Sequence, residues 1–120
     1  MARNYSKLTI KLLFGTATRC AYPSCTAALV FKDRGLLTTT VEIAHIRSEK
    51  PGGPRYDPGY PQEKIDEFGN LLLLCGRHHP AVDGHESAYP VDELLAWKER
   101  QAAQGNDTSV RRNSPPWTGS

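Results

Sequence analysis

The residues with the most distinctive chemistry in this 120-residue chain are three cysteines and four histidines. Cys20 and Cys25 form a C-x4-C pair, and Cys75 and His78 form a C-x2-H pair. Both spacings are typical of structural zinc, which takes four thiolate or imidazole ligands in a tetrahedron. The alternative is three buried, reduced cysteines that act as small apolar residues. Zinc is the favoured interpretation because both spacings fit and no cysteine is left over.

A second set of residues could bind a catalytic ion and move a proton. His45 ends an alternating stretch, residues 41–46, and a neutral imidazole there could act as a general base near physiological pH. His79 and Asp83 are spaced i, i+4 on an expected helix, so they could hold a divalent cation together. Consecutive helical residues are turned by about 100°, so His78 and His79 should serve different ions.

The segment 47–61 contains four prolines and three glycines and must be a loop. Long loops in small domains tend to be functional or disordered, and this one directly follows His45. We expect its polar side chains to contact substrate, although they could be ordinary solvated charges: Arg47, Lys50, Arg55 and Tyr56. Asn70, which follows Gly69, could be a site residue or part of a plain turn.

The elements that must position these residues can be outlined from periodicity and breakers. Helices are predicted over residues 6–14 (ending at Gly15), from 77 to about 82, and over 91–103 (ending at Gly105). Strands are predicted over 28–31 and 36–46, around a turn at 33–35, and over the buried run 71–74. Residues 62–68 should form one or two helical turns. The chain is therefore expected to be α+β, with one domain over residues 1–105 and a disordered tail over 106–120.

Composition limits the classes of protein to consider. The formal net charge is +2, so any positive field for a nucleic acid must be local. No apolar run is long enough to cross a bilayer and no secretory signal opens the chain, so the cytoplasm is the expected location and no membrane partner is expected. A reducing cytoplasm disfavours disulfides. A domain of this size has a small core, which a metal could reinforce.

Several motifs in order resemble a bacterial branch of the HNH endonucleases, over about residues 5 to 103. They are residues 43–46 around His45, 53–57, 70–75, His79 with Asp83, and 94–98. The resemblance implies a small ββα-metal core, in which a two-stranded hairpin carries the base and a helix carries a metal ligand. It implies cleavage of DNA with Mg²⁺ or Mn²⁺, with His45 as base, His79 as metal ligand and Asn70 as the middle asparagine. Proteins of this branch often serve in bacterial defence or mobile elements, attached to a sensor.

The chain departs from the family pattern at two places. Many members have an aspartate ligand immediately before the first histidine, where this chain has Ala44. Asp83 is our first choice for the missing carboxylate and Glu42 the second. His78 stands where a zinc-binding cysteine is common, which is a chemically acceptable exchange. The alternative function is a zinc-stapled binding module for nucleic acid or protein whose nuclease site has decayed. RNA as substrate and a homodimer or effector partner stay open.

Overall fold

The computed structural model describes residues 5–105, so the predicted tail over 106–120 lies outside the described residues. The described chain is a small α+β protein with three α-helices and two short antiparallel sheets. The elements are α1 (Lys7–Thr16), β1 (Val30–Asp33), β2 (Leu36–Thr39), β3 (Val41–His45), β4 (Leu71–Cys75), α2 (His78–Gly84) and α3 (Val91–Gln104). Single turns of 3-10 helix occupy Gln62–Lys64, Phe68–Asn70 and Glu86–Ala88.

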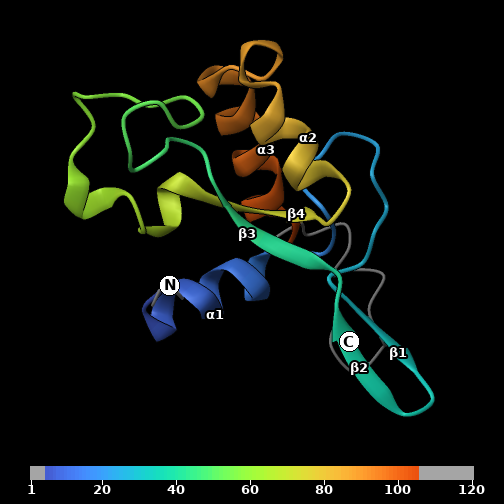
Figure 1. The fold of residues 1–120 in the computed structure, drawn as a ribbon. Helices are drawn as coiled ribbons and strands as arrows, with labels where there is room; N and C mark the ends of the chain where they lie inside the picture. The colour runs from blue at the N-terminus through green and yellow to red at the C-terminus, as the bar shows by residue number, and fades with distance from the viewer. Residues whose placement is uncertain (1–4, 106–120) are drawn as a thin grey trace.

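The core is built on the sheet of β3 and β4 (Figure 1). The two strands are antiparallel, with Val41 opposite Cys75 and His45 opposite Leu71. Every residue of β4 is buried, as its continuous apolar sequence predicts. The helix α3 packs its buried Leu94 and Trp97 into the same core. His45 is therefore the last residue of a strand whose partner, β4, is buried in the core.

The long strand predicted over residues 36–46 is in fact two strands that pair with different partners. Residues up to Thr39 pair with β1, whereas Val41 onward pairs with β4. Thr40 makes the change, because its N–H donates to Leu29 O and its carbonyl accepts from Gly76 N. The stretch from Thr38 to Ile43 is rich in β-branched residues on both sides of Thr40, so the sequence does not mark this switch.

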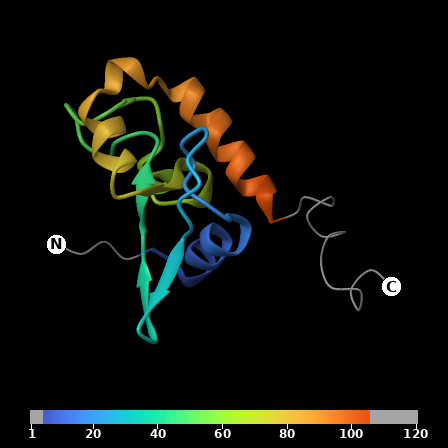
Figure 2. The same ribbon diagram turned by 90° about the vertical axis from the view of Figure 1, so that its right-hand side faces the viewer.

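The β1–β2 hairpin extends away from the rest of the protein in both views (Figures 1 and 2). Its turn residues Arg34 and Gly35 have φ angles of 55° and 79°, which is the left-handed pair that a two-residue hairpin turn requires. All eight strand residues are exposed, including Phe31, Leu36 and Leu37.

The helix α1 begins at Lys7, where the hydroxyl of Ser6 accepts from Thr9 N and caps the first turn. The prediction that Gly15 ends this helix is wrong, because the helix continues to Thr16 and Ala17 N still donates to Leu13 O. Its buried face is Thr9 and Leu13, while Leu8 is 65% exposed. Gly105 donates its N–H to Thr16 O at 2.7 Å and joins the ends of α1 and α3.

Between β3 and β4 the chain follows the long loop that the prolines and glycines predict, with no helix or strand between residues 46 and 61. The helix α2 begins immediately after β4 and its turn. Among residues 5–105 no helix has the length and apolarity to cross a membrane.

Candidate metal centre and active site

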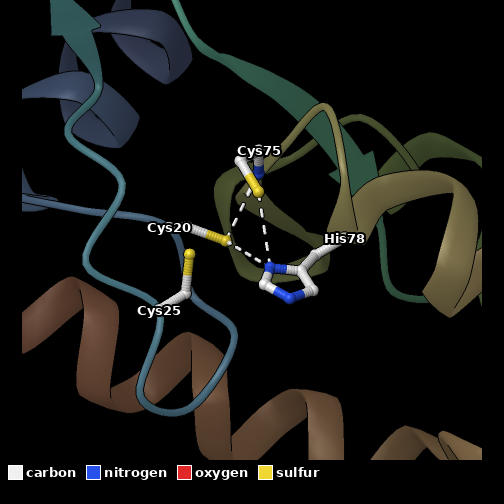
Figure 3. Close-up of side chains that lie close together, drawn as sticks. All are labelled: Cys20, Cys25, Cys75 and His78. Atoms are coloured by element: carbon white, nitrogen blue, oxygen red, sulfur yellow. Dashed lines mark hydrogen bonds between the residues drawn. The ribbon is translucent and has the colours of Figure 1, made fainter.

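Three cysteines and one histidine from two distant segments of the chain converge at the end of β4 (Figure 3). The ligand atoms of Cys20, Cys25, Cys75 and His78 all lie within 4.8 Å of one another. His78 Nδ1 is 3.3 Å from Cys75 Sγ and 3.7 Å from Cys20 Sγ. A tetrahedral zinc ion with ordinary bond lengths would separate sulfur from nitrogen by about 3.5 Å. The group is therefore close enough to bind one metal ion, and its donor chemistry fits zinc.

Local structure aims each donor at this point. Pro23 and Ser24 form a tight turn, in which Ser24 has a φ of 70° and Cys25 N donates to Tyr22 O. The ring of Tyr22 stacks on the His78 ring at 3.9 Å, with 5° between the planes. Cys75 N donates to Cys20 Sγ at 3.3 Å, so the end of β4 is tied to the N-terminal turn even without a metal.

The pKa values of two of the thiols depart from the ordinary value of a cysteine. Burial raises the pKa of Cys20 to about 12. Burial also acts to raise the pKa of Cys75, but backbone hydrogen bonds from His78 and Arg77 outweigh it, and the pKa of Cys75 is lowered. A buried Cys20 thiolate is costly without a cation beside it. A bound Zn²⁺ ion would supply that charge.

His79, the next residue on α2, faces a different group, as the turn between consecutive helical residues requires. Its Nδ1 lies 2.6 Å from Glu42 Oε1 on β3, and its Nε2 lies 3.2 Å from Asp83 Oδ2. The bond to Asp83 raises the pKa of His79 and the bond to Glu42 adds to it, although burial acts in the opposite direction. His79 thus stands between two carboxylates, one on each ring nitrogen.

Asp83 is held by an arginine as well as by His79. Arg55 Nη2 donates to Asp83 Oδ1 at 2.7 Å. Burial acts to raise the pKa of Asp83, but the hydrogen bonds from His79 and Arg55 outweigh it and lower that pKa. Both carboxylate oxygens therefore have partners within the protein.

Arg55 lies inside the protein, with only 4% of its side chain exposed. Besides Asp83 it donates to three backbone carbonyls: Nε to Ile46 O at 2.7 Å, Nη1 to Val82 O at 3.4 Å and Nη2 to His45 O at 3.3 Å. Contact between Arg55 and phosphate stays a prediction of the sequence. The observed contacts favour a role in joining the loop, the end of β3 and α2.

His45 makes a contact that the sequence analysis missed. Its Nε2 lies 2.8 Å from Oδ1 of Asp66, in the segment that returns to β4. The two side chains are 22% and 36% exposed, so the pair lies at the surface of the site. Residue 66 falls in a stretch predicted only as helical turns. Its proximity to His45 depends on the register of β3 and β4, which no local pattern reveals.

Asn70 is completely buried and holds both ends of the long loop. Its Oδ1 accepts from Arg47 N at 3.0 Å, and its Nδ2 donates to Arg47 O at 3.1 Å and Ile65 O at 2.9 Å. It is therefore more than a turn residue, because it fixes the chain two residues after His45 and one residue before Asp66.

The remaining predicted contacts lie at the surface of the loop. The guanidinium of Arg47 lies over the ring of Tyr60, 4.3 Å from its centroid, and Lys50 is exposed. Tyr56 is half-buried, and its N–H donates to Gly53 O. Contact of Arg47 or Lys50 with a substrate stays a prediction of the sequence.

Comparison with known protein families finds no family whose model matches this chain, and a search of curated proteins finds no relative.

Proposed function

We propose that the protein is a metal-dependent endonuclease of the HNH type that hydrolyses phosphodiester bonds in DNA. The sequence resemblance implies a ββα-metal core, and the order of elements supports it: β3, the long loop, β4 and α2. One histidine lies at the end of β3 and another near the start of α2. The observation that carries the proposal is Arg55 Nη2, which donates to both His45 O and Asp83 Oδ1. This single nitrogen joins the backbone of the proposed base to the carboxylate that contacts His79, the proposed ion ligand.

In the proposed reaction, His45 is the general base. It accepts a proton from water while the water oxygen forms a bond to phosphorus, and the bond from phosphorus to the leaving sugar oxygen breaks. The leaving alkoxide then takes a proton from solvent. A Mg²⁺ or Mn²⁺ ion would neutralise charge on the phosphate and the leaving oxygen.

We assign the ion to the side of His79 that faces Glu42. One imidazole nitrogen can bind an ion only if it is unprotonated, and the other nitrogen then carries the proton. On the Nε2 side an ion would meet the guanidinium that already occupies Asp83, at close range and little exposed to solvent. On the Nδ1 side it would meet Glu42, whose side chain is 58% exposed. Glu42 thereby replaces the aspartate absent at Ala44, and Asp83 orients His79.

The substrate would have to lie along the edge of β3 that no strand of residues 5–105 covers. Side chains alternate along a strand, so Glu42 and His45 project to opposite faces. A phosphate at the free edge is accessible from both faces, and Arg47 and Lys50 follow directly. Contacts of this kind bind the backbone without reading sequence.

Nicking of supercoiled plasmid tests the proposal. Zinc-loaded protein with Mg²⁺ or Mn²⁺ should nick DNA, and a chelator or His45→Ala should abolish nicking. Glu42→Gln should raise the concentration of Mn²⁺ needed for half-maximal nicking more than Asp83→Asn does. Equal nicking by wild type and His45→Ala would overturn the assignment. A labelled RNA of the same sequence tests the other substrate.

The alternative is a decayed binding module, which Ala44 in place of a carboxylate favours. Tight binding of DNA without cleavage under any divalent ion would support it. The nuclease is favoured instead by Glu42, whose Oε1 lies 2.6 Å from His79 Nδ1. A carboxylate is therefore present beside this imidazole although Ala44 stands where many members of the family have an aspartate.

A further inference from the structure

The carboxylate of Asp66 determines which nitrogen of His45 carries a proton. An ionised carboxylate can only accept hydrogen bonds. Its oxygen is 2.8 Å from Nε2, so in the neutral ring Nε2 must be the N–H donor and Nδ1 must hold the lone pair. Among residues 5–105, Asp66 is the only hydrogen-bond partner of this imidazole. Nδ1 is thus left to accept a proton from another molecule.

The backbone around Asp66 holds its carboxylate in place. Ile65, the residue before it, is buried at 3% exposure and its carbonyl accepts from Asn70 Nδ2. The same amide group binds both backbone groups of Arg47, two residues after His45. One buried side chain therefore fixes the chain on both sides of the His45–Asp66 contact. An accidental pairing of two surface side chains would lack this support.

We infer that Asp66 is a positioning residue for His45: it holds the imidazole in the Nε2–H form with Nδ1 directed at the attacking water. The inference rests on the proposed nuclease function and adds a residue to it. When Nδ1 takes the proton of water, the ring becomes an imidazolium, and the Asp66 carboxylate stabilises the new positive charge without itself taking a proton.

The expected effect on rate is moderate. Loss of an orienting carboxylate should lower kcat by about 10- to 100-fold, less than in a buried triad because Asp66 is partly exposed to solvent. KM should change little, because Asp66 does not contact the substrate. Asp66→Glu keeps a carboxylate and should recover part of the loss.

Nitrogen NMR on the zinc-loaded protein reads the tautomer directly, without substrate or catalytic ion. Long-range proton–nitrogen spectra of histidine-labelled protein, recorded at about pH 8.5 where imidazoles are ordinarily neutral, distinguish Nε2–H from Nδ1–H. His45→Gln assigns the signals. Wild type and Asp66→Glu should show the Nε2–H form, and Asp66→Ala should show a mixture. Glu67→Ala, an exposed neighbouring carboxylate, is the matched control and should match wild type.

The inference is overturned if wild-type His45 is in the Nδ1–H form, or if Asp66→Ala leaves the tautomer unchanged. The wild-type spectrum decides even if a variant fails to fold. A failure of the nuclease proposal is seen separately, as equal nicking by wild type and His45→Ala. A higher KM with an unchanged kcat for Asp66→Ala would also contradict a positioning role.

Discussion

Replacing Asn70 by alanine tests how much the loop beside the proposed active site depends on one buried amide. The side chain makes three hydrogen bonds to backbone groups of Arg47 and Ile65. A net value of about 1 kcal/mol for each predicts a loss of about 3 kcal/mol in the free energy of unfolding. With a urea dependence of about 2 kcal/mol per molar, the unfolding midpoint should fall by about 1.5 M.

Gln101 provides a matched control in the same protein. It is 2% exposed and also makes three amide hydrogen bonds to the backbone: Oε1 accepts from Leu73 N, and Nε2 donates to Leu73 O and Arg19 O. Gln101→Ala should therefore cost a similar free energy. It should leave nicking unchanged at a temperature where the protein is folded, because its partners Leu73 and Arg19 are not among the proposed site residues.

The measurement is urea unfolding of both zinc-loaded variants, followed by plasmid nicking well below their midpoints. We expect similar midpoints and a large loss of nicking only in Asn70→Ala. A midpoint for Asn70→Ala within 0.3 M of wild type, about 0.6 kcal/mol, would refute the energetic reasoning. Equal loss of nicking in both variants would refute the assignment of Asn70 to the site.

Three further predictions concern stability. Arg55→Met removes the buried guanidinium that binds Asp83 and three carbonyls and should cost about 3 to 5 kcal/mol; unchanged urea unfolding would contradict this. Burial lowers the pKa of Lys98 from 10.5 to about 8, so the unfolded chain binds more protons between these values and stability should rise with pH across that window. Lys98→Met should flatten this rise of stability with pH. Equal slopes of the urea unfolding midpoint against pH in wild type and Lys98→Met would contradict the prediction. Chelation of zinc, or Cys25→Ser, should lower the thermal midpoint and the zinc retained after dialysis, whereas full stability without metal would argue against a structural ion.

The elements with strong local signals were predictable from the sequence. Residues 71–74 have no polar side chain, and the observed strand β4 is buried throughout. The apolar stripe of residues 91–103 matches α3, which ends at Gln104. The C-x4-C and C-x2-H spacings predicted a Cys/His group, and the structure brings all four residues together.

The parts that depend on pairing between distant segments were not predictable. The break at Thr40 arises because β2 and β3 pair with different partners, while the sequence on both sides of it is rich in the β-branched residues that favour strands. Asp66 reaches His45 only because His45 pairs with Leu71. Arg55 looks like a solvated loop charge in the sequence, yet it has a positive φ of 55°, and its side chain binds four acceptors on two segments, the end of β3 and α2.

The ligands of the Cys/His group have a consequence for synthesis on the ribosome. Cys20 and Cys25 emerge early, whereas Cys75 and His78 emerge only after most of the domain has been translated. Two thiolates alone form an incomplete coordination shell, so tight zinc capture must wait for the second pair. That pair is followed at once by His79. A nascent chain would therefore complete the proposed zinc site and the proposed active site at the same stage, and shorter translation products should carry neither.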